Sequence, residues 1–418
     1  MPISTREQVG ADAGLAVGET RRVPILDDAG ALAAAAELAA RFRAGASERD
    51  QRRSVPRRQV QELAQAGLLA ATVPAEYGGS DIAVTTLAEV FRLLAAADPS
   101  IAQIPHSHFV SVNLLKVAGT PSQRSFFFAE MLAGGSFGNA QTEPPTSDLQ
   151  VIDTRITRSA PGVFRLNGRK GYCTGALFAS WIPTLARLDD GTPEGGEELI
   201  AFVPRTASGV TVVDDWAGMG QRTAASGRVE FADVEVPSEH IVRRAVALNR
   251  PRGYGAFSGL LHAAILVGIA RGALVDAAAF VRERALPVED AHVARAQDDP
   301  LSVQRFGALT VEVRAAEAAL RVAAEAVAAV LADPTPDHAT EALLAVGTVT
   351  VQGERAALAV ADGVFEVGGI RAAMDDVNLH RHWRNARTHA LGEPTRWKQH
   401  HLGRHTLLGI SPPRHSQI

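Results

Sequence analysis

Cysteine is nearly absent from this 418-residue chain, since Cys173 is its single thiol. One cysteine excludes an intrachain disulfide and any zinc site built from several cysteines. Nothing around Cys173 indicates a nucleophile, so we expect it to serve strand packing. The low cysteine content is consistent with a reducing compartment. Residues 1–9 lack the apolar run of a secretory signal peptide, so we expect a cytoplasmic protein.

Long hydrophobic runs and an excess of basic charge are also missing. The most apolar window, Leu260–Ala270, is about half as long as a membrane span and is followed by Arg271. It predicts a buried helix and no association with a membrane. The 42 Lys and Arg residues against 46 Asp and Glu give a formal net charge of −4. Proteins that bind nucleic acid through its phosphates are usually basic, so a nucleic-acid partner is not expected.

Common nucleotide and nucleophile motifs are missing as well. Gly218-Met219-Gly220 lacks the third glycine of a dinucleotide-binding loop and leads into further β structure, which argues against a Rossmann site for NAD. Gly134–Gly138 fits the G-x-S-x-G pattern of α/β-hydrolases. That motif requires a strand before it and a helix after it, and the reverse order is expected here. These glycines are more typical of a helix end.

What the chain does contain is a change of hydrophobic period along its length. Residues 1–24 are polar and rich in glycine, which predicts a loose N-terminal arm. Helical spacing predominates over residues 25–136, short β-branched runs separated by turn signals over 137–245, and long helical segments over 246–418. The pattern predicts an α+β protein with an N-terminal helical domain, a middle β domain of barrel or sandwich type and a C-terminal four-helix bundle.

Histidine is concentrated near the C-terminus, where seven of the 13 histidines follow residue 379. His401 and His405 are four residues apart on an expected helix, which is a spacing found in helical zinc sites. Neighbouring arginines such as Arg396 and Arg404 would repel a dication. We therefore expect no metal site and interpret the cluster as an interface or an anion-binding region.

Several segments taken together resemble the acyl-CoA dehydrogenase superfamily. They are Pro74-Ala75-Glu76-Tyr77-Gly78-Gly79, Thr142-Glu143-Pro144, Gly168–Gly175, Phe231–Pro237 and Phe365-Glu366-Val367-Gly368-Gly369. The likeness covers roughly residues 25–410 and follows the helix, β, helix order derived above. It implies the acyl-CoA dehydrogenase-like fold for the whole chain.

Within that superfamily the chain is most similar to the flavin-dependent monooxygenases of sulfur acquisition and dibenzothiophene desulfurisation. The strongest segment is His382–His389, followed by Trp397-Lys398, and Trp216–Thr223 adds to it. The resemblance implies FMN, reduced by a separate NAD(P)H:flavin reductase, with FAD as the other candidate cofactor. It implies oxygen as co-substrate and oxygenation of a small organosulfur compound, such as a sulfone, through a flavin hydroperoxide. It also implies a homotetramer built as a dimer of dimers.

The same resemblance assigns roles to individual residues. Thr174 corresponds to a hydroxyl near flavin N5, and His108 and His389 correspond to imidazoles near the flavin edge that can deliver a proton. These three are the predicted catalytic residues. The predicted cofactor-binding residues are Asn139, Gln141, Thr142, Tyr172, Thr174, Arg295, Gly368, Gly369 and Arg371. The two arginines are assigned to the phosphate, which a guanidinium can bind bidentately, partly from a neighbouring subunit.

One departure from the monooxygenase pattern leaves alternatives open. Where those enzymes show His-Asp-Pro, this chain has Gly392-Glu393-Pro394. Counted from Arg384, Glu393 falls at the place of the glutamate with which acyl-CoA dehydrogenases remove the α-proton of a thioester. An acyl-CoA dehydrogenase that uses Glu393 and FAD is therefore an alternative, and a non-enzymatic scaffold of the same fold is another.

Overall fold

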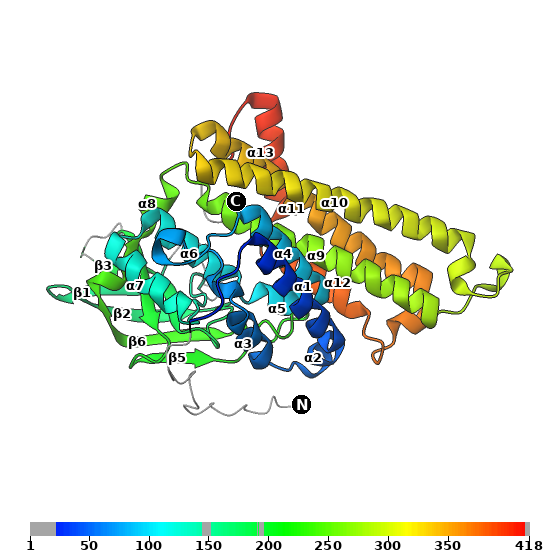
Figure 1. Cartoon of the computed structure of the whole chain (residues 1–418), viewed down its shortest axis with the longest axis horizontal. Coiled ribbons are helices and arrows are strands. Elements are labelled where there is room, and N and C mark those ends of the chain that lie inside the picture. The colour runs from blue at the N-terminus through cyan, green and yellow to red at the C-terminus, as the bar shows by residue number, and fades with distance from the viewer. Residues whose placement is uncertain (1–21, 144–151, 190, 192–195, 414–418) are drawn as a thin grey trace.

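A computed structural model describes residues 22–143, 152–189, 191 and 196–413. Most of the expected N-terminal arm, residues 1–21, lies outside this part of the chain. Figure 1 shows the strands gathered at one end of an elongated molecule, while three long helices run toward the other end. The N-terminal helices lie between these two regions.

The N-terminal region is helical, as the sequence predicts. Its helices are α1 (Asp28–Ala44), α2 (Ala46–Arg52), α3 (Arg57–Gln65), α4 (Val84–Ala97), α5 (Pro99–Gln103), α6 (His106–Ala118) and α7 (Pro121–Leu132). The Asp27 side chain accepts a 2.7 Å hydrogen bond from the Gly30 amide at the start of α1. Thr120 and Gln123 form a capping box at the start of α7. These caps satisfy amide groups that have no partner inside the helix.

The middle region forms one mixed sheet. Its strands are β1 (Arg155–Ala160), β2 (Val163–Lys170), β3 (Trp181–Asp189), β4 (Glu198–Pro204), β5 (Val210–Val213), β6 (Arg228–Pro237) and β7 (Ile241–Arg243). The strand order is β5-β6-β2-β1-β3-β4-β7, in which β1 and β3 are parallel and the other neighbours are antiparallel. β3 and β4, which follow each other in the chain, pair in antiparallel fashion.

The C-terminal region is dominated by three long helices. Its elements are α8 (Arg244–Leu248), α9 (Tyr254–Glu283), α10 (Pro300–Ala332), α11 (Pro336–Gly368), α12 (His380–Ala390) and α13 (Thr395–Leu408). α9 packs against α10 and α11 on one side and against α4 on the other, while α12 and α13 pack on α11. The order helices, sheet, helices confirms the predicted α+β class.

Two helices, α9 and α11, are long and apolar enough to cross a membrane by length and composition. In the most apolar 18-residue window of each, 72% of α9 and 56% of α11 is buried inside the protein. The Leu260–Ala270 window lies within α9, where ten of its eleven residues are buried. Its apolar character is therefore explained by core packing, as the sequence predicts.

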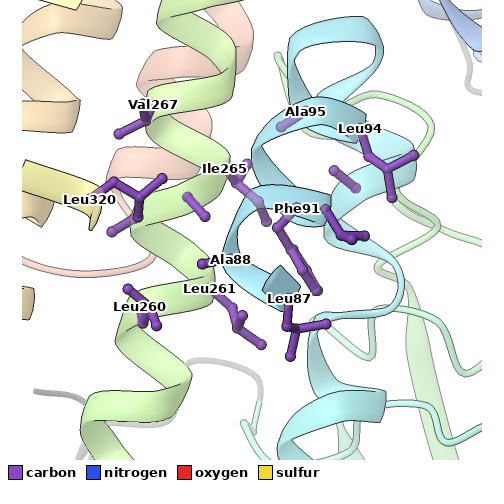
Figure 2. Packing of buried hydrophobic residues seen from close by; sticks show 14 of the residues in the cluster. Leu87, Ala88, Phe91, Leu94, Ala95, Leu260, Leu261, Ile265, Val267 and Leu320 are labelled. Carbon is purple, nitrogen blue, oxygen red and sulfur yellow. The ribbon is translucent and has the colours of Figure 1, made fainter. Parts of the chain in front are cut away.

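The backbones of α9 and α4 approach closely at two glycines. A Cβ atom on Gly268 would lie 2.5 Å from the Ala95 Cβ and 2.6 Å from the Arg92 carbonyl oxygen. A Cβ on Gly272, one turn later, would overlap the Ala96 carbonyl oxygen. Figure 2 shows Leu261 and Ile265 of α9 facing Phe91 of α4 across the same contact. Only glycine lets the two helices pack at this distance.

Replacing Gly268 with alanine should therefore destabilise the protein. Alanine adds up to about 1 kcal/mol of intrinsic helix stability, but the added methyl group meets backbone atoms, and overpacking of this kind costs about 1–3 kcal/mol or more. We expect a lower midpoint of thermal unfolding for Gly268→Ala, measured by circular dichroism.

Gly307 of α10 provides a matched control, because a Cβ placed there meets no atom within 4 Å. Gly307→Ala should leave the midpoint unchanged or raise it, since helix propensity is then the main effect. Equal midpoints for the two variants would contradict the close-packing explanation.

Candidate active site

Residues 137–143 run beside β3 and form the edge of the candidate flavin site. Phe137 and Ala140 make single bridges to β3. The Asn139 amide donates to the Thr174 carbonyl at 2.9 Å, and the Gly171 amide donates to the Thr142 carbonyl at 2.9 Å. These two bonds hold Asn139 and Thr142, which are predicted to bind the cofactor, against residues 171–174. That second segment includes Tyr172 and Thr174, which are also predicted to bind the cofactor. We call residues 139–142 and 172–174 together the polar shelf.

A buried ion pair between Lys170 and Glu143 holds the two segments of the shelf together. The side chain of Lys170 is completely buried, and its Nζ lies 2.7 Å from the Glu143 Oε1. Burial alone would raise the pKa of Glu143, but hydrogen bonds from Lys170 and from the amides of Asp153 and Thr154 lower it to about 2. Burial lowers the pKa of Lys170, and Glu143 opposes that effect. The pair joins residue 143 to the end of β2, so the two shelf segments cannot separate without exposing a buried charge.

The shelf carries its polar and aromatic groups in different environments. Tyr172 has a left-handed backbone (φ 55°) and a half-exposed ring, with its centroid 6.2 Å from that of Trp216. The Asn139 Nδ2 donates to the Tyr172 carbonyl at 3.2 Å, and the Gln141 Nε2 donates to the Pro183 carbonyl at 2.9 Å. These bonds orient both amide side chains.

Thr174, by contrast, is nearly buried. Its Oγ1 lies 2.6 Å from the Ser226 Oγ, and either hydroxyl can donate. The neighbouring Cys173 is buried in the core of the sheet region, and burial raises the pKa of its thiol to about 12. Such a thiol is not a nucleophile near pH 7, in agreement with the packing role expected from the sequence.

His108 is buried and uses both ring nitrogens inside the protein. Its Nε2 lies 2.6 Å from the Leu69 carbonyl oxygen, and its Nδ1 accepts from the Phe137 amide at 3.2 Å. Burial lowers its pKa to about 4. In this arrangement His108 ties α6 to the start of the shelf. Its predicted role as a proton donor stays a prediction, and it would require one of these two bonds to open.

His389 lies on α12 and is also nearly buried. Its Nε2 is 3.0 Å from the His262 carbonyl oxygen, and its Nδ1 is 3.2 Å from the Gln221 Nε2. These partners favour the tautomer with the proton on Nε2. Burial lowers the pKa of His389 to about 4, so the ring is neutral near pH 7.

Two further histidines, which were not among the site residues predicted from the sequence, adjoin His389. The rings of His106 and His262 stack with centroids 3.7 Å apart, and those of His262 and His389 are 5.2 Å apart. Burial lowers the pKa of His106 to about 4 and that of His262 well below its ordinary value. The available signal was a histidine within the otherwise apolar Leu260–Ala270 run. We call these three residues the histidine stack.

One loop, residues 214–227 between β5 and β6, connects the shelf to the histidine stack. Trp216 contacts the Tyr172 ring, Ser226 bonds to Thr174, and Gln221 bonds to His389. The Trp216 Nε1 donates to the Gln221 carbonyl at 2.8 Å within the loop. The loop therefore brings the predicted residues Tyr172, Thr174 and His389 into one connected polar structure.

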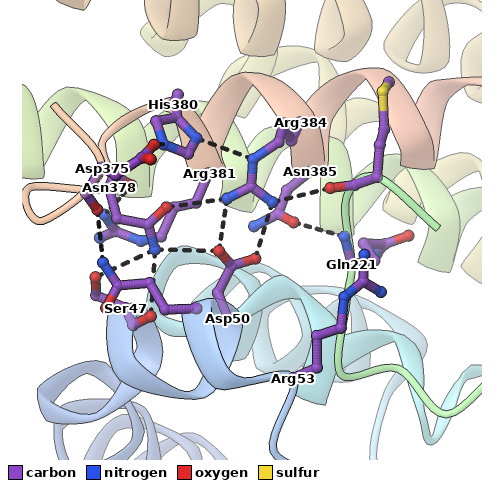
Figure 3. A network of polar contacts seen from close by, with 12 residues as sticks. Ser47, Asp50, Arg53, Gln221, Asp375, Asn378, His380, Arg381, Arg384 and Asn385 are labelled. Atoms are coloured by element: carbon purple, nitrogen blue, oxygen red, sulfur yellow. Dashed lines mark hydrogen bonds and ion pairs between the residues drawn. The ribbon is translucent and has the colours of Figure 1, made fainter. Parts of the chain in front are cut away.

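A polar network positions the helix that carries His389. The Arg384 Nη2 lies 2.6 Å from Oδ2 of the buried Asp50 in α2, and Asn378 Nδ2 donates to the same oxygen at 3.0 Å (Figure 3). Burial would raise the pKa of Asp50, but Arg384 and Asn378 outweigh it and lower the pKa. The Gln221 amide donates to the Asn385 Oδ1 at 2.6 Å. α12 is thus fixed to both α2 and the 214–227 loop.

The predicted phosphate-binding residues lie elsewhere in the chain. Gly368 ends α11 and Gly369 follows it with φ 61°, while the Arg371 Nη1 donates to the Arg284 carbonyl at 3.1 Å. Arg295, in the connection between α9 and α10, pairs with Asp298 at 2.8 Å. Figure 1 shows this end of the long helices on the side of the molecule away from the sheet. One chain therefore does not bring these residues to the shelf.

Glu393 is paired with a buried lysine. The Lys398 Nζ lies 2.9 Å from the Glu393 Oε2, within ion-pair distance although not with hydrogen-bond geometry. Lys398 is 3% exposed at its side chain and Glu393 is 12% exposed. The carboxylate is thus neutralised by a cation on α13, which is the arrangement of a structural ion pair.

His401 and His405 both lie on α13, and burial, with nearby charges, lowers the pKa of His401. Over the described ranges, no group of three His, Cys, Asp or Glu residues is placed to hold a metal ion.

Comparison with protein-family models divides the chain in the same way as its secondary structure. Residues 30–135 match the acyl-CoA dehydrogenase N-terminal domain, residues 138–234 the middle domain and residues 260–394 the C-terminal domain. These matches confirm the resemblance inferred from the motifs.

Relatives that the chain matches along nearly their whole length include monooxygenases. The chain is 32% identical over 394 residues to a dibenzothiophene monooxygenase of Rhodococcus erythropolis, covering 91% of this chain and 94% of that protein. It is 30% identical over 391 residues to the probable FMNH2-dependent monooxygenase SfnC of Pseudomonas putida, covering 91% and 96%. The FMN-bound structure of TdsC from Paenibacillus sp. A11-2 superposes with a TM-score of 0.88 at 26% identity, covering 93% and 100%.

The buried histidines should make the stability of the protein depend on pH. They should do so at higher pH values than those at which most carboxylates titrate. His106, His108 and His389 each have a pKa lowered to about 4 by burial, against about 6.5 in an unfolded chain. Between these values the unfolded state binds more protons, so stability falls as the pH falls. We expect the thermal midpoint to decrease progressively from pH 6.5 toward pH 4.5.

His106→Phe tests this assignment, because it keeps a ring against His262 and removes one titrating group. The midpoint of this variant should fall less than that of the wild type between pH 7 and pH 4.5. An equal fall in both proteins would mean that His106 does not contribute to the pH dependence.

Proposed function

The chain belongs to the acyl-CoA dehydrogenase family, and on that premise we propose that it is a reduced-FMN-dependent monooxygenase of a small organosulfur compound, such as a sulfone, in sulfur acquisition. The observation that carries the proposal is similarity along nearly the whole chain to monooxygenases, one of which acts on dibenzothiophene. A separate NAD(P)H:flavin reductase and oxygen would be its partners. A cytoplasmic location is part of the proposal, and the low cysteine content favours it.

The polar shelf fits FMN chemically. An isoalloxazine ring presents alternating hydrogen-bond donors and acceptors along one edge and two apolar faces. The shelf offers the amide groups of Asn139 and Gln141 and the exposed Thr142, beside the half-exposed ring of Tyr172. Bound in its reduced form, FMN supplies the electrons that activate oxygen.

Thr174 and His389 are the residues that we assign to the chemistry. When the Ser226 hydroxyl donates to the Thr174 Oγ1, the Thr174 hydroxyl keeps its own proton to offer to a ligand. His389 is neutral near pH 7 and carries its proton on Nε2, which donates to the His262 carbonyl, so it can deliver that proton when this bond opens. Both side chains are less than a tenth exposed. A site that excludes water in this way limits the loss of reactive oxygen species to solvent.

We propose that a second subunit completes the cofactor site. Arg295, Arg371 and the Gly368-Gly369 turn lie at the far end of the long helices, where they cannot reach the shelf of their own chain. Large apolar side chains are exposed along α10 and α13, including Leu301 at 72%, Val311 at 66% and Leu407 at 83%. Exposed apolar surface of this kind marks interfaces, and it supports a homotetramer built as a dimer of dimers.

No observation favours the two alternative functions. The ion pair with Lys398 gives Glu393 a structural partner, whereas an α-proton base needs a carboxylate free to face the substrate. The scaffold interpretation does not explain why polar groups from the shelf, the 214–227 loop and α12 converge.

The proposal is tested by combining the protein with a flavin reductase, NADH, FMN and oxygen, and offering a panel of sulfones. We expect an oxygenated product that forms only when the reductase and FMN are both present, detected by mass spectrometry. An acyl-CoA panel with bound FAD provides the opposing test. Reduction of FAD by an acyl-CoA, with no sulfone product, would contradict the proposal.

Thr174→Ala and His389→Ala should each uncouple oxygen consumption from product formation. Without the hydroxyl or the imidazole proton, we expect at least a tenfold lower ratio of product to oxygen consumed, since positioned proton donors contribute about 10²–10⁴ in rate. Oxygen uptake and hydrogen peroxide release are measured together.

Two controls keep these variants interpretable. Thr174→Ser keeps a hydroxyl and should retain most of the coupling. His400→Gln changes an exposed histidine of α13, whose ring packs against Trp397 instead of the site, and should retain wild-type coupling. Unchanged coupling in both alanine variants would remove Thr174 and His389 from the mechanism.

A further inference from the structure

Gln221 bonds to three parts of the molecule from the middle of the loop between β5 and β6. Its backbone amide donates to the Asn385 Oδ1 of α12 at 2.6 Å (Figure 3), and its carbonyl accepts from the Trp216 Nε1 at 2.8 Å. Its side-chain Nε2 lies 3.3 Å from the Pro99 carbonyl oxygen and 3.2 Å from the His389 Nδ1. The residue is 5% exposed, so these bonds form away from water and join the loop to both α5 and α12.

The backbone at Gln221 is held in an unfavourable conformation. Its φ of 44° lies in the left-handed region, which residues other than glycine rarely adopt. A Cβ atom on the preceding Gly220 would overlap the Arg384 carbonyl oxygen, so the loop lies directly against α12. Such a conformation persists only where the surrounding contacts impose it, and residues of this kind cluster at functional sites. The Gln221 side chain is therefore fixed in place by the loop and by α12.

The partners of Gln221 determine which way its amide group faces. A carbonyl oxygen can only accept, so the atom that faces Pro99 is the amide nitrogen. The same nitrogen faces the His389 Nδ1, which therefore accepts. The His389 Nε2 lies 3.0 Å from the His262 carbonyl oxygen, which also only accepts, so Nε2 carries the proton. Both nitrogens of the ring require the same tautomer, and a second proton on Nδ1 would meet an N–H group of Gln221.

The other groups around His389 do not favour a charged ring. His106 of α6 and His262 of α9 are the titratable groups that interact with it, and Lys398 of α13 acts on His262. Burial lowers the pKa of His106 to about 4 and that of His262 well below its ordinary value, so both are neutral near pH 7. These neighbours are neutral or cationic, and none of them stabilises a positive charge on His389.

We propose that Gln221 is a positioning residue for His389: its amide nitrogen occupies Nδ1 and keeps the single proton of the imidazole on Nε2, where it can be offered to an oxygen atom in the site. The His262 carbonyl lies inside α9, where helical carbonyls also accept from the amide four residues later. The bond from Nε2 can therefore open without leaving that oxygen unpaired. A neutral imidazole can stabilise negative charge that develops on an oxygen. The proposal rests on the monooxygenase function above and adds the residue that sets the protonation of His389.

The tautomer is tested first on the unaltered full-length protein, by neutron diffraction from deuterated crystals grown near pH 7. We expect deuterium on the His389 Nε2 and none on Nδ1, with the Gln221 nitrogen directed toward Pro99 and His389. Deuterium on the His389 Nδ1 would overturn the proposal. This measurement requires neither substrate nor turnover, and it decides the question even if a variant of Gln221 does not fold.

Gln221→Glu tests the consequence for the reaction, because it keeps the size of the side chain and replaces a donor with an acceptor. An ionised carboxylate favours a proton on the His389 Nδ1, which leaves Nε2 without one while the ring is neutral. At pH 8.5 we expect the ratio of product to oxygen consumed to be at least about tenfold below wild type. As the pH falls to 6, the carboxylate and imidazole together take up a proton, and the ratio should recover severalfold. A ratio in this variant that equals wild type at pH 8.5, or that does not change with pH, would overturn the proposal.

Two comparisons keep the pH profile interpretable. The wild-type ratio should stay constant between pH 6 and 8.5, since burial and Gln221 keep His389 neutral there. Gln221→Met keeps the length of the side chain and adds no titrating group, so its ratio should not vary over this range either. The same recovery in Gln221→Met would show that it arises elsewhere and would overturn the proposal. Single turnovers with photoreduced FMN and a sulfone keep the pH dependence of the reductase out of the measurement, and circular dichroism shows that each variant is folded at both pH values.

The role of Gln221 and the proposed function can fail separately. Deuterium on the His389 Nδ1 in a protein that oxygenates a sulfone would refute the role of Gln221 and leave the monooxygenase function intact. Deuterium on Nε2 in a protein that oxygenates no organosulfur compound would refute the function and leave the tautomer assignment intact.

Discussion

The close approach of α9 to α4 at Gly268 and Gly272 is the constraint on which the rest of the molecule depends. It sets the position of α9, which contacts helices of both the N-terminal and the C-terminal regions. The same helix carries Phe257 into the wall of a cavity that α4, α6 and α10 also line, His262 into the histidine stack and Gly259 beside the Glu393 carboxylate. A shift of α9 by the width of one methyl group would move all three.

Buried ion pairs also hold parts of the structure in position, one pair at the sheet and one at α12. Lys170 and Glu143 hold the two shelf segments together, and Arg384 with Asp50 holds α12 against α2. Removing one partner of such a pair leaves an uncompensated buried charge, which typically costs about 3–5 kcal/mol. Geometry at the candidate site is therefore maintained by ion pairs outside it, while the site itself uses neutral donors: two hydroxyls, amide groups and histidines kept uncharged by burial.

The arrangement separates three tasks. In the proposed enzyme the shelf holds the flat heterocycle, the histidine stack supplies neutral imidazoles, and the cavity between α4, α6, α9 and α10, with Arg252 in its wall, offers space for a ligand. The 214–227 loop touches the first two through Trp216, Gln221 and Ser226. A loop that bonds to both the shelf and α12 can transmit a change at one of them to the other.

The sequence by itself determined the α+β class and the order of the three regions, and its motifs indicated the family and a flavin cofactor, with FMN and FAD both open. This was possible because hydrophobic period, caps and motifs are local properties of the chain. The three long helices α9, α10 and α11 lie within residues 246–418, where long helical segments were expected. Only the tertiary structure decided which of the expected site residues meet. Asn139, Thr142, Tyr172 and Thr174 form one shelf, whereas Arg295 and Arg371 lie far from it. Only the fold places His106 and His262 beside His389, since burial and ring contacts depend on residues distant in sequence.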